Sequence, residues 1–399
     1  MVKILSYNVF YKSMQTYPTY KNCEPIINDN VLKISYTKCL DNVSKFIEKH
    51  KPYDFIFIQE AANFMTLLSI TPVLKSMNYV SDKFDLETIV TFYNKNLVLD
   101  NTNYKLVGYM ADVNRPFHVL FFKGELCVIN LHAGHKADIY NIDNYLVNCL
   151  IDNPFKKEFL QKLKTYDIII GGDFNDNLNN GLTILTERFF NCPRQLYGFN
   201  RTPSCCNPNL NYLSDRNNAK FDHILSTIPT ITSQIVQVPR ASDHMPIIAN
   251  IIKRIGYDFD GVLHNDVGIS DREGQRHPYN LKGPYQPNHN IIKNITYNLS
   301  LGYEVYIITA RQKNRLNFNT IINHLIKCQL NPEKITILFS NGQDKTKLLH
   351  EYKINSFYED SYLRINELYN SYKKGLLSDL HNLYLVDPDD SSIKSINLM

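Results

Sequence analysis

Tryptophan is absent from this chain of 399 residues, although the chain contains 27 tyrosines. Asn, Ile and Lys are also abundant, so we attribute the absence to a bias toward A- and T-rich codons. Aromatic positions that hold Trp in other proteins are then expected to hold Tyr or Phe.

Long apolar runs are also lacking. No stretch of eighteen apolar residues occurs, which excludes a conventional transmembrane helix. The opening "MVKILSYNVF" has the pattern of a strand and leaves no room for a signal peptide ahead of it. The eight cysteines are scattered, with no CxxC pair at zinc spacing, and this indicates reduced thiols. We therefore expect an intracellular, cytoplasmic protein that does not contact a membrane.

The charge balance excludes a strongly basic protein. Lys and Arg number 43 against 39 Asp and Glu, a formal net charge of +4. Many nucleic-acid-binding proteins carry a larger positive charge, so composition alone gives little support for that partner. Apolar residues make up 44% of the chain, which is enough for packed interiors, and charged residues at 21% show no excess of the kind typical of disordered proteins. The length predicts two or three domains.

Short, often β-branched apolar runs predict strands in the N-terminal part. A few helical segments, such as 142–163, lie between these strands. The pattern predicts two sheets packed face to face with helices outside. The strand runs lie at 2–10, 53–60, 118–124, 125–133, 166–174, 220–227 and 245–253.

After residue 253 strands and helices alternate, which is typical of a doubly wound parallel sheet. Helices are expected at 290–302 and 318–330, and the first of them closes on Gly302. There is no internal repeat and no Gly/Ser linker near 253–255. The sequence therefore predicts two abutting domains, residues 1–253 and 254–399.

Acids and amides end several N-terminal strands. Carboxylate and amide oxygens suit a hard ion such as Mg²⁺, and a His beside an Asp suits proton transfer to a water nucleophile. The glycines of "GGD" at 171–173 are expected to let an anionic substrate approach the backbone. The residues concerned are Asn8, Glu60, His132, His135, Asp173, Asn175, Asp222, Asp243 and His244.

In this order the motifs resemble the endonuclease/exonuclease/phosphatase superfamily, the fold of deoxyribonuclease I, over residues 1–253. The resemblance implies a four-layer α/β/β/α sandwich and Mg²⁺-dependent hydrolysis of a phosphate ester. One departure is "SYNV", where many members have Trp. The motifs are "SYNV" (6–9), "IQE" (58–60), "NLHAGH" (130–135), "GGDFND" (171–176), "FDHI" (221–224) and "SDHMP" (242–246).

By this resemblance Asn8 and Glu60 hold Mg²⁺, with assistance from Asp243. Asp173 and Asn175 align the attacking water and the phosphate.

The same resemblance implies that His244 is the base or a phosphate-contacting group, oriented by Asp222. His132 contacts the scissile phosphate, and His135 is a further substrate-binding candidate. Arg115 is either a phosphate ligand or an arginine of a solvated loop.

A second set of polar groups begins at "GYDFDGVLH", 256–264, where an apolar strand ends in D-x-D-G. The first Asp can attack phosphorus as a carboxylate, and the second can protonate the leaving group and then activate water. "IITAR" at 307–311 adds a hydroxyl, "DKTK" at 344–347 adds ammonium groups, and "FYEDS" at 357–361 adds carboxylates.

This second set resembles the haloacid dehalogenase (HAD) superfamily, and most of all its small phosphatases associated with nucleic-acid repair. The resemblance implies a doubly wound, Rossmannoid HAD-like domain over about residues 254–399. Asp258 is then the nucleophile that becomes aspartyl-phosphate, and Asp260 is the general acid/base. Asp258 and Asp260 also contribute to Mg²⁺ binding, Asp260 through its backbone carbonyl.

Three further positions follow from the same resemblance. Thr309 grips the transferring phosphoryl group. Lys345 neutralises charge, with Lys347 as the alternative, and Asp360 is a metal ligand, with Glu359 next in line. The stretch 265–289 is short for a large cap, which suits a bulky or polymeric substrate.

Together the two sets predict a bifunctional hydrolase, a nuclease or endonuclease joined to a phosphatase, with one or more Mg²⁺ ions in each domain and Mn²⁺ as the alternative ion. The expected partner is nucleic acid, DNA or RNA, in end processing or repair, and no partner protein is evident. One alternative is a small-molecule phosphatase acting on inositol phosphates or nucleotides. Another is a non-enzymatic binding module with relic sites.

Overall fold

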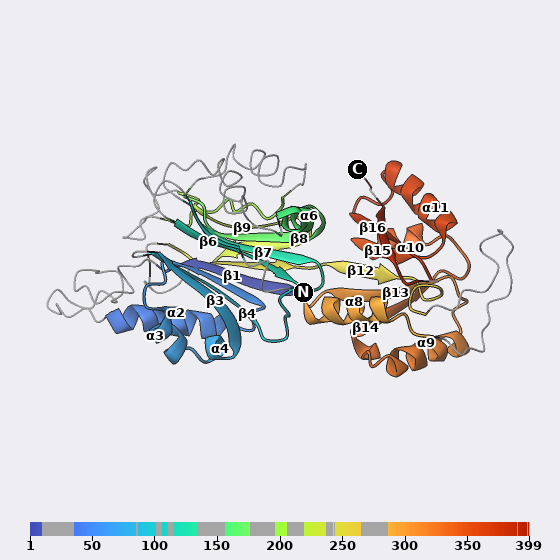
Figure 1. Ribbon diagram of the computed structural model, residues 1–399, viewed down its shortest axis with the longest axis horizontal. Helices are drawn as coiled ribbons and strands as arrows, with labels where there is room; N and C mark the ends of the chain where they lie inside the picture. Colours follow the sequence, from blue (N-terminus) through green and yellow to red (C-terminus); the bar gives the residue numbers. More distant parts are fainter. Residues whose placement is uncertain are drawn as a thin grey trace. The chain divides into compact units, whose positions relative to one another are not determined.

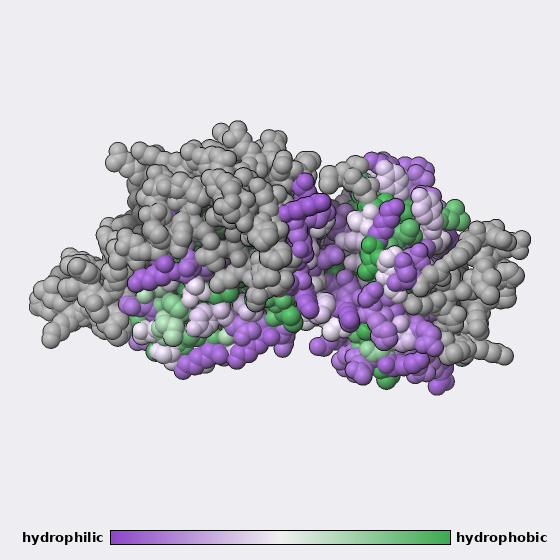
Figure 2. Space-filling model, viewed as in Figure 1, coloured by the Kyte–Doolittle hydropathy of each residue, from purple (hydrophilic) through white to green (hydrophobic). Residues whose placement is uncertain are grey.

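The protein forms two compact units that divide between Ile251 and Ile252, with Met1 belonging to the second unit. No helix in the part of the chain that the structure describes is long and apolar enough to cross a membrane. Over the residues that the structure describes, the surface visible in Figure 2 is largely hydrophilic, with smaller separate hydrophobic areas. The structure is a computed structural model that describes residues 1–9, 36–84, 87–100, 106–110, 115–133, 156–175, 196–205, 219–236, 242, 244–264, 286–388, 390–396 and 398.

The first unit contains two sheets that stack face to face (Figure 1). One sheet has the strand order β10 (Ile231–Ile235), β11 (Ile247–Ile251), β1 (Val2–Asn8), β2 (Phe55–Gln59), β4 (Glu87–Asn94) and β3 (Met77–Phe84). The other has the order β5 (Leu106–Met110), β6 (Arg115–Phe122), β7 (Leu126–His132), β8 (Asp167–Asp173) and β9 (Asp222–Ser226).

Helices cover the outer faces of both sheets. Leu40, Val43 and Ile47 of α2 recur at helical spacing and pack against the apolar side chains of β1 and β2. Phe159 and Leu163 of α6 do the same for the other sheet. The mixed α/β fold with face-to-face sheets that the sequence predicts is therefore confirmed. The helices are α2 (Tyr36–His50), α3 (Phe64–Ile70), α4 (Pro72–Lys75) and α6 (Lys156–Thr165).

Two glycines of β8 allow close packing inside this unit. A Cβ atom on Gly171 would lie 2.5 Å from the ring of Phe57 in the facing sheet. A Cβ atom on Gly172, where φ is +151°, would lie 1.9 Å from the carbonyl oxygen of Leu131 in β7. The structure thus gives these glycines a packing role, and the approach of an anionic substrate to the backbone stays a prediction.

Replacing Gly172 by Ala is expected to lower the free energy of unfolding by at least about 3 kcal/mol, because it adds a backbone clash to backbone strain. Gly375→Ala is the matched control. Gly375 also has a positive φ of +75°, yet a Cβ there meets nothing within 4 Å. Urea unfolding of both variants measures the difference, and equal losses would contradict the packing role.

The second unit is built on one sheet with the order β14 (Ile335–Phe339), β13 (Glu304–Thr309), β12 (Arg254–Tyr257), β15 (Ser356–Glu359), β16 (Asn382–Val386) and β17 (Ile393–Ile396). The first five strands pair in parallel and β17 is antiparallel to β16. The parallel sheet predicted for this part of the chain is thus present. Parallel strands bring their carboxyl ends to one edge, and this edge carries Asp258, Thr309 and Glu359.

Among the described residues of this unit, four α-helices accompany the sheet, with α8 and α9 on one side and α10 and α11 on the other (Figure 1). The side chain of Asn288 caps the first helix by accepting a hydrogen bond from the backbone N–H of Ile291. The elements are α8 (His289–Ser300), α9 (Arg315–Lys327), the 3₁₀ turn η6 (Pro332–Lys334), α10 (Thr346–Glu351) and α11 (Tyr362–Lys373).

The cysteines differ from the sequence-based expectation. Cys39 and Cys205 are each disulfide-bonded, so reduced thiols throughout the chain were a wrong prediction. Cys127 and Cys328 are not disulfide-bonded.

Candidate active sites

Strand ends of both sheets in the first unit meet at a group of buried polar side chains. Asn8 ends β1, and its Nδ2 donates to Asp173 Oδ2 at 2.9 Å and to Glu60 Oε1 at 3.1 Å. Asp173 ends β8 directly opposite His132 at the end of β7. One amide therefore joins carboxylates from two sheets, and we call this group, with the residues around it, the N-terminal site.

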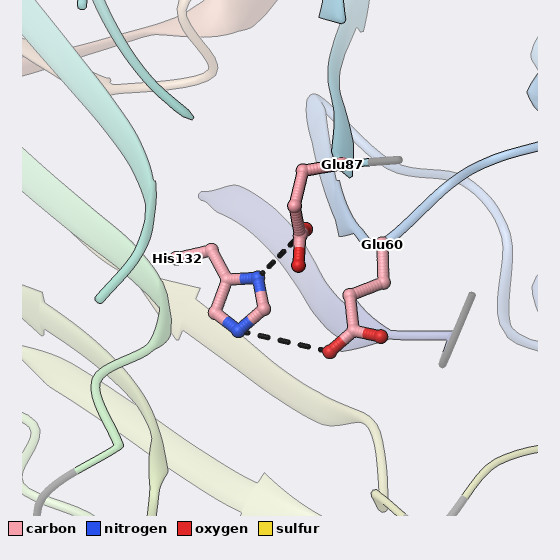
Figure 3. Close-up of side chains that lie close together, drawn as sticks. All are labelled: Glu60, Glu87 and His132. Atoms are coloured by element: carbon pink, nitrogen blue, oxygen red, sulfur yellow. Dashed lines mark hydrogen bonds and ion pairs between the residues drawn. The ribbon is translucent and has the colours of Figure 1, made fainter. Parts of the chain in front are cut away.

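One side of the N-terminal site contains two glutamates and a histidine (Figure 3). His132 Nδ1 lies 3.3 Å from Glu87 Oε2, and His132 Nε2 lies 3.7 Å from Glu60 Oε1. Glu60 has a φ of +53°, a strained backbone that turns its side chain at the end of β2. The three residues offer ligand atoms within 4.8 Å of one another, so they can hold a metal ion.

Arg115 lies at the start of β6 and is almost completely buried in this site. Its Nη1 is 3.0 Å from Glu87 Oε1 and 3.8 Å from Glu60 Oε1, and it also contacts the His132 ring. Burial raises the pKa of Glu87, but the hydrogen bond and charge of His132 and the charge of Arg115 outweigh it and leave that pKa lowered. The arginine is therefore part of a buried charged network, not of a solvated loop.

The other side of the N-terminal site contains a histidine between two aspartates. His244 Nδ1 lies 2.9 Å from Asp222 Oδ2, and His244 Nε2 lies 3.5 Å from Asp173 Oδ2. A carboxylate that accepts from Nδ1–H fixes the ring and its tautomer, and leaves Nε2 to exchange a proton. These three residues form a second group whose ligand atoms lie within 4.8 Å.

The two aspartates differ in their pKa. Burial raises the pKa of Asp222 to about 6, against the opposing effect of His244, and the charge of Asp173 raises it further. Burial also acts on Asp173, but the charges of His244 and His132 and the N–H of Asn175 leave its pKa lowered. That N–H lies 2.8 Å from Asp173 Oδ1. Asp173 is thus the anionic member of the pair, and its negative charge suits a bound cation.

The second unit contains a separate site at the carboxyl edge of its parallel sheet, which we call the C-terminal site. Asp258 follows β12, and its Oδ2 contacts the buried Nζ of Lys345. The same Nζ lies 2.8 Å from Glu359 Oε2 at the end of β15. Although burial lowers the pKa of Lys345, the charges of Asp258 and Glu359 raise it overall, so the ammonium stays charged.

Acids outnumber the cation at this point of the C-terminal site. Asp258, Glu359 and Asp360 offer carboxylate oxygens within 4.8 Å of one another. Burial and the neighbouring carboxylates raise the pKa of Asp258 and of Asp360 well above the ordinary value, despite the opposing charge of Lys345. Gly261 makes room for this crowding, because a Cβ there would lie 2.1 Å from Asp360 Oδ2. A divalent cation would relieve the repulsion, and the oxygen ligands fit Mg²⁺.

Asp260 lies in a different environment. Arg311 binds it with two hydrogen bonds, Nε to Oδ2 at 2.9 Å and Nη2 to Oδ1 at 2.5 Å, and His264 Nε2 lies 3.2 Å from Oδ1. Burial opposes ionisation, but these hydrogen bonds and charges lower the pKa of Asp260 to about 2. Asp260 is therefore ionised in this state, which is the form that can accept a proton from water.

Most of the predicted site residues come together in one site or the other. The structure adds three residues that sequence reasoning missed, namely Glu87, His264 and Arg311. Asp243 and His135 lie outside the described residues, and Lys347 is exposed and absent from the acidic cluster. The N-terminal site gathers Asn8, Glu60, Arg115, His132, Asp173, Asn175, Asp222 and His244, and the C-terminal site gathers Asp258, Asp260, Thr309, Lys345 and Asp360.

Comparison with known proteins gives one relative by sequence and several by structure. No protein-family model matches the chain. Uncharacterized protein L684 of Acanthamoeba polyphaga mimivirus is 54% identical over 401 residues, which cover 99% of this chain and 80% of that protein.

Solved structures similar to part of the chain include proteins of the endonuclease/exonuclease/phosphatase group. Truncated TDP2 of Caenorhabditis elegans is 16% identical, with a TM-score of 0.40, and covers 62% of this chain and 96% of its own. The human Nocturnin catalytic domain is 13% identical, with a TM-score of 0.39, and the match covers 63% of this chain and 94% of the Nocturnin chain. ANGEL2, a 2′,3′-cyclic phosphatase, is 12% identical, with a TM-score of 0.41, and the match covers 62% of this chain and 94% of the ANGEL2 chain.

Proposed function

The chain belongs to the same family as uncharacterized protein L684 of Acanthamoeba polyphaga mimivirus, and for this chain we propose a bifunctional, Mg²⁺-dependent phosphoesterase that processes nucleic-acid ends. Residues 1–253 act as an endonuclease/exonuclease/phosphatase domain, and residues 254–399 act as a HAD-like phosphatase domain. The observation that carries the proposal is that each unit gathers acids, and in the first unit histidines, whose ligand atoms lie within 4.8 Å of one another.

In the N-terminal site we propose hydrolysis of a phosphodiester. Glu60 and Asn8, with Asp243, are the residues that would hold Mg²⁺, and a bound ion would neutralise charge on the phosphate oxygens. Asp173 and Asn175 orient the attacking water.

His244 Nε2 accepts a proton in this reaction or contacts the phosphate, and Asp222 holds its ring in place. Arg115 and His132 lie where they can balance negative charge that develops on the phosphate.

In the C-terminal site we propose removal of a terminal phosphate. A carboxylate oxygen of Asp258 attacks phosphorus and the bond to the leaving oxygen breaks, giving an acyl-phosphate, while Asp260, which has taken up a proton from solvent, gives that proton to the leaving oxygen. Water then attacks the same phosphorus while the ionised Asp260 takes a proton from it, which releases phosphate and restores Asp258. Lys345 balances charge beside Asp258, and Thr309 is a phosphoryl ligand. Asp258, Asp260 and Asp360 would hold Mg²⁺, which would screen the phosphate from the acids.

A short single-stranded oligonucleotide with a terminal phosphate and a label tests this function. With Mg²⁺ present, we expect two activities: cleavage of the oligonucleotide, either internally or at an end, and release of inorganic phosphate. Removing Mg²⁺ with a chelator should stop both activities. If no DNA or RNA is cleaved or dephosphorylated, the proposal is wrong.

The second candidate, hydrolysis of inositol phosphates or nucleotides, is favoured by the small net charge of +4. It predicts activity that changes little with salt, whereas a polymer substrate predicts a steep loss of affinity.

A further inference from the structure

We propose that residues 312–318, which we call the 312–318 segment, bind the last nucleotides of a single-stranded polynucleotide and lead its terminal phosphate into the C-terminal site. This inference rests on the proposed phosphatase function of that site and names its substrate as a strand end, not a small phosphate ester.

The position of the segment connects it to the reacting groups. It begins one residue after Arg311, which is hydrogen-bonded to Asp260, and three residues after Thr309 at the end of β13. It continues into the first turn of α9. A strand end held on this segment therefore lies at the same sheet edge as Asp258, because β12 and β13 pair in parallel.

The charge of this region suits a polyanion. No acidic residue occurs between Glu304 and Glu333, although the whole chain contains 39 acids. Lys313 and Arg315 are both exposed, and neither has an ion-pair partner among the residues that the structure describes. Unpaired cations of this kind can neutralise backbone phosphates of a single strand.

Exposed apolar side chains follow these cations along the segment. Leu316 is 67% exposed and Phe318 is 45% exposed, and they lie in the first turn of α9. At the start of α11, two residues after Asp360, Tyr362 is 66% exposed and Leu363 is 67% exposed. Both helices begin after strand ends at the carboxyl edge of the sheet. Aromatic groups together with cations are features that hold single-stranded nucleic acid by base stacking and charge.

The 312–318 segment is also held in one conformation. The side chain of Asn314 accepts from the backbone N–H of Asn317 at 2.8 Å, and Asn317 Nδ2 donates to the carbonyl of Gln312 at 2.7 Å. The backbone N–H of Lys313 donates to Asn341 Oδ1 at 2.6 Å, which ties the segment to the loop after β14. A surface fixed in this way loses little conformational entropy on binding.

The test is the double variant Lys313→Gln/Arg315→Gln, assayed on a single-stranded oligonucleotide with a 3′- or 5′-terminal phosphate and on p-nitrophenyl phosphate. We expect KM for the oligonucleotide to rise about tenfold at low salt, and the slope of log affinity against log salt to fall by about 1.4 if two phosphate contacts are lost. Hydrolysis of p-nitrophenyl phosphate should stay unchanged. Lys373→Gln/Lys374→Gln removes two exposed charges at the other end of α11 and should change neither reaction.

A second pair of variants tests the apolar part of the surface. Phe318→Ala and Tyr362→Ala should each raise KM for the oligonucleotide several-fold and leave p-nitrophenyl phosphate hydrolysis unchanged, since they remove stacking only.

An unchanged KM and salt slope for the oligonucleotide in all these variants would overturn the inference, as would an equal loss on both substrates. If the wild-type protein hydrolyses p-nitrophenyl phosphate but no oligonucleotide, this inference fails while phosphatase activity stands. If it hydrolyses neither, the proposed function itself fails.

Discussion

Replacing Asp258 by Asn is expected to reduce phosphate release by the C-terminal site by at least about 10⁴-fold, because an amide oxygen is a poor nucleophile toward phosphorus. Asn has the shape of Asp, and Lys345 keeps Glu359 as a partner at 2.8 Å, so the fold should persist. Phosphate release from a terminally phosphorylated oligonucleotide measures the loss. Cleavage by the N-terminal site serves as the internal reference.

Asp379→Asn is the matched control for this variant. Asp379 is a half-buried acid shortly before β16, at the amino edge of the same sheet, so it is remote from the reacting groups. The control should retain full phosphatase activity. If Asp258→Asn retained its activity as well, the reaction could not pass through an aspartyl-phosphate at this position.

The regular parts of the fold could be predicted because their patterns are strong. The helix expected at 318–330 is α9, but it begins at Arg315 because Asn314 supplies the cap, and it ends before Gln329, whose φ is +60°. The hairpin of β3 and β4 was not predicted. The sequence of β3, "MNYVSDKF", mixes polar and apolar residues, so neither a continuous apolar run nor clear alternation marks it.

The candidate sites were predictable where an acid or His directly follows an apolar strand, as at Asp173 and Asp258. Glu87 was missed because it begins a strand without a motif, and its partner His132 lies 45 residues away in the other sheet. Arg311 is part of the motif "IITAR", from which only a hydroxyl group was predicted to act. That its guanidinium reaches Asp260 is shown only by the fold. Residues that act through partners on other strands carry no local signal in a single sequence.

In the N-terminal site, Glu60→Gln is expected to reduce phosphodiester cleavage by about 10²–10³-fold at low Mg²⁺, because it removes a charged oxygen ligand while keeping the side-chain shape. Asn8 Nδ2 can still donate to the Gln oxygen, and Arg115 keeps Glu87 as a counter-charge at 3.0 Å. The loss should therefore arise from weaker metal binding, not from collapse of the site. Initial rates measured over a series of Mg²⁺ concentrations should show partial recovery as the concentration rises.

Glu158→Gln provides the comparison, since Glu158 lies on α6 with its side chain 53% exposed and should leave cleavage unchanged. Phosphate release by the C-terminal site should also be unaffected by Glu60→Gln, because its acids belong to the other unit. Full cleavage by Glu60→Gln at low Mg²⁺ would show that the ion is held elsewhere. A loss of both activities together would contradict the view that each unit has its own metal-dependent site.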